Sequence, residues 1–107
     1  MVLGTHVQIS CLVWNCCGLG NPCTENEFAE MVQEKDPSIV FLSKTWEDEA
    51  RLKQVLRKIH FENIFIAPRP NRGGGLVLFW RSSIDVSVVG SSKNFIDAII
   101  NKNKEDE

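Results

Sequence analysis

Two apolar segments, each leading to a polar residue, constrain the fold of this 107-residue chain most strongly. Residues 7–16 are nearly continuous in apolar and β-favouring residues, and residues 38–43 form a second, shorter apolar run. Such runs are typical of strands that are covered on both faces. Since a helical pattern follows each of them, the chain begins strand, helix, strand, helix. The two strands lead to Asn15 and Lys44, and a rigid strand end holds a side chain in a defined position.

Both helical segments carry an apolar face at helical spacing. Thr24 and Glu27 have the spacing of a capping box, which predicts that the first helix begins at Thr24. Asp36 and Pro37 end this helix, because the residue before a proline is pushed out of the helical region. Thr45 is expected to cap the second helix. The apolar face of that helix comprises Leu52, Val55, Leu56 and Ile59.

The second half of the chain reads as strands only. We expect them at residues 61–67, 76–80, 86–89 and 95–100, with a glycine-rich connection before residue 76. The fold class is therefore mixed α/β, with one β-sheet and two helices on one face of it. Residues 1–100 form one domain, and the charged residues 101–107 are expected to be a disordered tail.

Composition restricts the partners. The formal net charge of -2, from 12 basic and 14 acidic residues, gives no general basic field, so a nucleic-acid contact needs a local patch. Arg69, Arg72 and Arg81 are the candidates for such a patch. No apolar run reaches the roughly 18 to 20 residues of a membrane span, and the N-terminus lacks the pattern of a signal peptide. We expect an intracellular protein, nuclear or cytoplasmic, with no membrane partner.

Four segments together resemble a known superfamily. They are residues 14–16 (Trp-Asn-Cys), 36–42, 72–80 and 92–97. They are similar to motifs of the endonuclease/exonuclease/phosphatase superfamily, whose fold is like that of deoxyribonuclease I, and especially of its plant LINE-type retrotransposon branch. The resemblance implies the N-terminal part of a DNase I-like αββα sandwich. It also implies Mg²⁺-dependent hydrolysis of phosphodiesters in nucleic acid, such as the nicking of target DNA.

The resemblance assigns roles to individual residues. Asn15 takes the place of the Asn that positions phosphate or metal, here as a vestigial catalytic residue. Lys44 stands where the superfamily has a metal-binding Glu, and we do not expect it to bind Mg²⁺. A positive charge about 5 Å from a divalent cation opposes it by roughly 5 kcal/mol or more at an effective dielectric near 20. Asp97 and Arg72 fall in segments near the substrate, although a solvated strand residue explains Asp97 equally well.

Three functions follow from these residues. The chain is an Mg²⁺-dependent endonuclease with residual activity, a truncated and inactive relic of one, or a non-catalytic module that binds nucleic acid or protein. Lys44 and the lack of the superfamily's distal motifs favour the second, with no Mg²⁺ bound. A sheet face without its second layer predicts self-association. Trp14, Trp46 and Trp80 are expected in the core or at sheet edges rather than stacked on bases.

Overall fold

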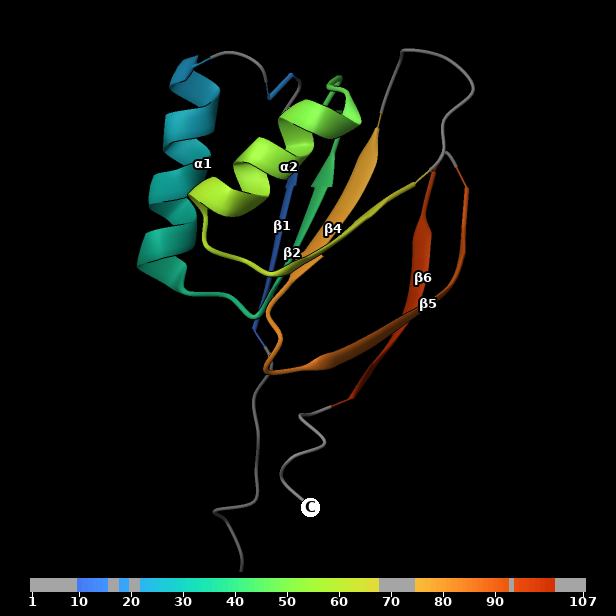
Figure 1. The fold of residues 1–107 in the computed structure, drawn as a ribbon. Coiled ribbons are helices and arrows are strands. Elements are labelled where there is room, and N and C mark those ends of the chain that lie inside the picture. The colour runs from blue at the N-terminus through green and yellow to red at the C-terminus, as the bar shows by residue number, and fades with distance from the viewer. Residues whose placement is uncertain (1–9, 16–17, 20–21, 68–74, 93, 102–107) are drawn as a thin grey trace, which may run out of the picture.

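The computed structural model describes residues 10–15, 18–19, 22–67, 75–92 and 94–101. Figure 1 shows two helices lying over the same face of a four-stranded sheet, with a separate pair of strands on the other side. The elements in chain order are β1 (Cys11–Asn15), α1 (Pro22–Lys35), β2 (Ile39–Ser43), α2 (Glu49–Lys58), β3 (Asn63–Ile66), β4 (Leu76–Trp80), β5 (Asp85–Ser91) and β6 (Ile96–Asn101). The mixed α/β class predicted from the sequence is confirmed.

The larger sheet has the strand order β1-β2-β4-β3. β1 and β2 are parallel, whereas β4 runs antiparallel to both of its neighbours. Asn15 pairs with Ser43, and Ser43 pairs with Leu76. The last residues of β1 and β2 and the first residue of β4 therefore share one end of the sheet.

The main core lies between this sheet and the helices. Phe28 of α1 is fully buried, and its ring stacks on Trp14 at a centroid distance of 5.7 Å and lies 6.4 Å from the ring of Phe79. α2 contributes Leu52 and Val55 to the same cluster. Because both helices bury their apolar faces in one cluster, they lie on one side of the sheet, as the sequence predicted.

The opposite face of the sheet is covered in part by a second layer. The sequence predicted one sheet, but β5 and β6 form a two-stranded antiparallel sheet of their own, with an irregular register between Val88 and Gly90. Residues of this hairpin pack on the buried Ile39 and Leu78, and they include Val86, Val88, Ile96 and Ala98. The chain thus begins its own second layer rather than leaving that whole face bare.

The structure corrects both predicted helix starts. α1 begins at Pro22, so Thr24 lies inside the helix and does not form the predicted capping box with Glu27. Proline suits the first position of a helix because its fixed φ is already helical and its missing N–H would have no helical partner. In α2 the cap is Asp48, whose carboxylate accepts from the backbone N–H of Arg51 at 2.9 Å, and not Thr45, which is buried in the preceding loop.

The predicted end of α1 is confirmed. Asp36 leaves the helix with a positive φ of 48°, its N–H donates to the carbonyl of Val32, and Pro37 follows. β6 extends to Asn101, and the charged residues 102–107 lie outside the described part of the chain. Among the described helices, none is both long enough and apolar enough to cross a membrane.

Candidate functional site

The loops that follow β1 and β2 meet at one end of the sheet. The N–H of Gly18 donates to the carbonyl of Lys44 at 2.8 Å, and the N–H of Leu19 donates to the carbonyl of Thr45 at 2.9 Å. Thr45 in turn donates its N–H to the carbonyl of Gly75, just before β4, at 3.3 Å. Backbone hydrogen bonds therefore fix the segment after β2 against two neighbouring segments.

This segment has an unusual backbone. Lys44 and Trp46 both have a φ of 55°, in the left-handed region that side chains with a Cβ rarely adopt. Thr45 between them is 1% exposed, and its Oγ1 has no hydrogen-bond partner in the described structure. Lys44 and Trp46 are both exposed. Residues held in such conformations cost about 1–3 kcal/mol each and occur preferentially at ligand sites.

Trp46 packs against Gly18. A Cβ added to Gly18 would lie 3.0 Å from Cε3 of the indole, and the φ of 101° at Gly18 also favours glycine. Trp46 is nevertheless 50% exposed, so one part of the ring contacts the glycine while the rest is open to solvent. The prediction that all three tryptophans are core or edge residues is wrong for Trp46.

The other two tryptophans behave as expected. Trp14 stacks in the main core, and Trp80 packs in the second cluster. Both lie in apolar strands, whereas Trp46 lies between the polar Thr45 and the acidic residues 47–49. That polar surrounding was the signal that could have identified Trp46 as a surface residue.

Two of the predicted site residues come together. Asn15 ends β1 and Lys44 directly follows β2, and because these strands are parallel neighbours with Asn15 opposite Ser43, both residues lie at the same end of the sheet. Asp97 belongs to β6 in the smaller sheet, where it is exposed and pairs with Gly90. Arg72 lies outside the described residues.

Of the three arginines in the predicted basic patch, the structure describes Arg81. Arg69, like Arg72, lies outside the described residues, and Arg81 follows β4 at the end of the sheet opposite to Gly75. The Arg81 guanidinium donates to Asp36 Oδ1 at 3.0 Å and to the carbonyl of Pro37 at 3.1 Å, and it lies 4.3 Å from the ring centroid of Phe61. Arg81 thus ties β4 to the end of α1.

The residues at the strand ends do not fit Mg²⁺. Magnesium prefers oxygen ligands, usually with one or two carboxylates, but Asn15 offers one amide oxygen and Lys44 an ammonium group. Within residues 10–15, 18–19, 22–67, 75–92 and 94–101, no group of three His, Cys, Asp or Glu side chains is placed to hold a metal ion. An amide N–H and an ammonium suit an anion, since both donate hydrogen bonds.

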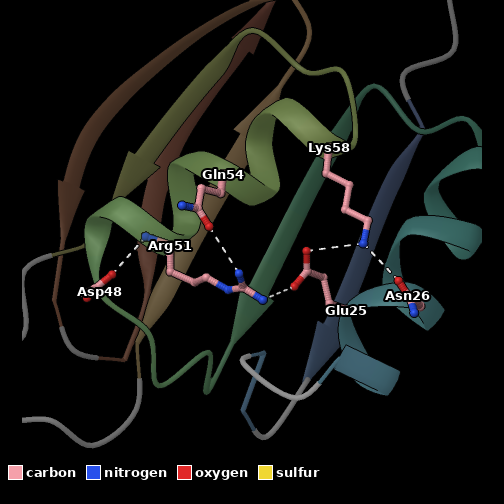
Figure 2. Close-up of polar contacts among 6 residues, drawn as sticks. All are labelled: Glu25, Asn26, Asp48, Arg51, Gln54 and Lys58. Carbon is pink, nitrogen blue, oxygen red and sulfur yellow. Dashed lines mark hydrogen bonds and ion pairs between the residues drawn. The ribbon is translucent and has the colours of Figure 1, made fainter.

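A second polar cluster joins the two helices and is structural. Figure 2 shows the carboxylate of Glu25 between Arg51 and Lys58, with the Lys58 Nζ at 3.4 Å from Glu25 Oε2. Lys58 Nζ also donates to Asn26 Oδ1 at 2.9 Å. Glu25 is 8% exposed and its cationic partners are partly exposed, so the cluster joins α1 and α2 at the edge of the helix layer.

The arrangement of helices, four-stranded sheet and hairpin matches the DNase I-like fold of solved structures. A truncated TDP2 from Caenorhabditis elegans is similar over 74% of this chain and 32% of its own, with 20% identity and a TM-score of 0.56. A mannosyl-6-phosphatase from Bacteroides thetaiotaomicron is similar over 79% of this chain and 35% of its own, with 14% identity and a TM-score of 0.57.

These likenesses are in structure. No protein-family model matches the chain. No curated protein matches it in sequence either. The chain spans about a third of the length of each of these two solved structures, 32% of the first and 35% of the second.

Proposed function

We propose that this chain is a phosphodiester-binding domain of the endonuclease/exonuclease/phosphatase superfamily that does not hydrolyse its ligand. The observation that carries the proposal is that β2 leads to a lysine, and not to a carboxylate, at the sheet end that it shares with Asn15. The motif resemblance supports the plant LINE-type retrotransposon branch as its origin. Its ligand is then DNA inside the cell.

Lys44 suits a phosphate better than a metal. Its ammonium is a compact positive charge that binds a phosphate oxygen directly, and the side chain of Lys44 is exposed. The backbone beneath it is fixed by the hydrogen bonds from Gly18 and to Gly75. A fixed backbone loses less conformational entropy on binding, so more of the attraction between Lys44 and a phosphate contributes to the affinity.

The overall charge limits the strength of this binding. With a net charge of -2, the chain attracts DNA only through its local contacts. Neutralising one or two phosphates gives a salt slope of about -0.9 for each phosphate of a duplex. We therefore expect weak binding that a moderate rise in salt concentration abolishes.

The structural neighbours support a phosphate ester as the ligand class. The mannosyl-6-phosphatase is, by its name, an enzyme that acts on a phosphorylated sugar. Since this chain spans 35% of that protein, with 14% identity over the matched region, the hydrolytic activity of the neighbour is not transferred with the fold.

A nicking assay tests the absence of hydrolysis. Supercoiled plasmid is incubated with Mg²⁺ and the unmodified chain, with the variants Lys44→Glu and Asn15→Ala run in parallel. We expect no nicking above the buffer control from any of the three, because the described residues hold no group of three His, Cys, Asp or Glu side chains placed to bind a metal ion, and Lys44→Glu adds only a single carboxylate. Nicking by the unmodified chain that Asn15→Ala abolishes would refute the proposal.

A binding assay tests the role of Lys44. The affinity for a labelled duplex is measured by fluorescence anisotropy at several salt concentrations. Lys44→Gln is expected to weaken binding and to make the salt slope shallower by about one. Lys53→Gln is the matched control, because Lys53 is an exposed lysine of α2 that pairs with Glu49 at 3.0 Å. Equal effects of the two variants would show that Lys44 has no special role.

We also propose weak self-association through the part of the second layer that remains exposed. Several large apolar residues of the hairpin are open to solvent: Val89, Phe95, Ile99 and Ile100. Exposed apolar surface of this kind favours contact with a second copy. Sedimentation velocity at rising concentration measures it, and a constant monomer coefficient would contradict this proposal.

A further inference from the structure

Trp46 lies two residues after the proposed phosphate contact, Lys44, and does not belong to either hydrophobic cluster of the described residues. It is 50% exposed, and Lys44, two residues earlier, is exposed as well. Thr45 between them is 1% exposed, so the chain is anchored at this residue while its two neighbours remain at the surface. A positive side chain and a half-exposed indole therefore lie two residues apart in the loop after β2.

The backbone holds this arrangement against an intrinsic cost. A bulky residue such as Trp46 with a φ of 55° is a genuine outlier. The backbone just before it is held in place, because Lys44 and Thr45 are hydrogen-bonded to Gly18, Leu19 and Gly75. Gly18 adds a second restraint, since the indole lies where a Cβ of any other residue would be 3.0 Å from Cε3. The indole is thus in contact with Gly18 while half of the residue remains exposed.

We propose that Trp46 is a stacking platform for an unpaired base of single-stranded nucleic acid whose phosphate contacts Lys44. The inference rests on the proposed phosphodiester binding and names the form of nucleic acid that the site takes. A ring stacks on a base whose face is accessible, which is the case in a single strand and not inside a duplex. Stacking does not depend on the identity of the base, so little sequence preference is expected.

The experiment compares two oligonucleotides of equal length and charge. One is a labelled oligo-dT, and the other is an abasic strand that keeps the phosphates and lacks the bases. Binding of both is measured by anisotropy at low salt for the unmodified chain and for Trp46→Ala, Trp46→Asn, Trp46→Phe and Phe95→Ala. Asn tolerates a left-handed backbone, so Trp46→Asn removes the ring without strain. Phe95→Ala removes a ring that is 54% exposed in another part of the chain.

Trp46→Ala and Trp46→Asn are each expected to weaken oligo-dT binding about tenfold, which corresponds to the loss of one stacked base. Trp46→Phe retains part of the affinity, and Phe95→Ala leaves it unchanged. The affinity for the abasic strand is unchanged in all four variants. Unchanged oligo-dT binding in Trp46→Asn, or an equal loss on both strands, would overturn the inference.

The same measurements separate this inference from the proposed function. Lys44→Gln is expected to weaken both strands, because both carry phosphates. If it does so while the Trp46 variants have no effect, phosphodiester binding stands and the stacking platform is refuted. If the unmodified chain binds neither strand, the proposed function fails as well. Melting temperatures within a few degrees of the unmodified chain establish that each variant is folded.

Discussion

Replacing Glu25 by Gln is expected to weaken the contact between the two helices. The carboxylate of Glu25 is bonded to Arg51 and lies 3.4 Å from the Lys58 ammonium, and its side chain is 10% exposed (Figure 2). Gln has nearly the same shape and keeps one acceptor oxygen, but it lacks the negative charge. The substitution therefore isolates the electrostatic part of the contact.

The expected magnitude follows from the exposure of the partners. Breaking a fully buried ion pair costs about 3–5 kcal/mol, and a hydrogen bond to a charged group contributes about 1.5–3 kcal/mol. Arg51 and Lys58 are 34% and 41% exposed, so water can solvate both cations once the carboxylate is gone. We expect a loss of about 2 kcal/mol in the free energy of unfolding, and a melting temperature lower by about 4–8 °C per kcal/mol.

Urea denaturation and thermal melting measure this loss, with Glu30→Gln as the control. Glu30 is an exposed residue of the same helix, so its substitution is expected to change stability by less than about 0.5 kcal/mol. A double-mutant cycle with Arg51→Met is expected to give a coupling energy of about 1 kcal/mol. If Glu25→Gln and Glu30→Gln cost the same, or if the coupling energy is zero, the inter-helix cluster does not stabilise the fold as argued.

Three further predictions concern the loop after β2, the start of α2 and the edge of the sheet. Asp48→Ala is expected to cost about 1 kcal/mol in urea denaturation because it removes the cap on α2, and Asp48→Ser to recover most of this loss; an unchanged midpoint would contradict the assigned cap. Thr45→Val is expected to raise stability by about 1 kcal/mol, since it replaces a buried hydroxyl without a partner by a methyl group, and a clear loss would reveal a partner. Burial raises the pKa of the Cys11 thiol, so less thiolate is present at a given pH. At pH 8 to 9, iodoacetamide is therefore expected to alkylate Cys11 more slowly than a model peptide thiol, as followed by peptide mass spectrometry. Equal rates would refute this.

The interiors of β2 and β4 were predictable because their chemistry is local, whereas the prediction that the first strand is covered on both faces is wrong, since β1 lies at the sheet edge with Val13 67% exposed. β2 and β4 are short apolar runs that are buried on both faces, with Leu42 in the cluster beneath the helices and Ile39 and Leu78 in the cluster beneath the hairpin. The parallel pairing of β1 and β2 follows from the helix between them. The family resemblance, and not this pairing, assigned Asn15 and Lys44 to one site, and the structure places both at the same end of the sheet.

The helix starts were less predictable, because several residues near each start are able to cap a helix. Thr45 and Asp48 are both good N-caps, and the choice depends on the path of the loop. Thr45 is drawn into the interior by its hydrogen bonds with Leu19 and Gly75, which leaves Asp48 at the start of α2. Those partners are distant in the sequence, so no local pattern reveals them.

The fold and the chemistry of this site depend on different residues, so the conclusion about the fold is independent of the proposed function. The position of residue 44 is set by the buried residues of β2 and by backbone hydrogen bonds, and neither involves the Lys44 side chain in the core. A change at residue 44 therefore alters the chemistry of the strand end without removing a buried residue of β2. Under the proposed function, the fold sets where the phosphate contact lies, and the side chains at the strand ends decide whether the phosphate is hydrolysed. In this chain those side chains are an amide and an ammonium, which is why the proposed function is binding and not hydrolysis.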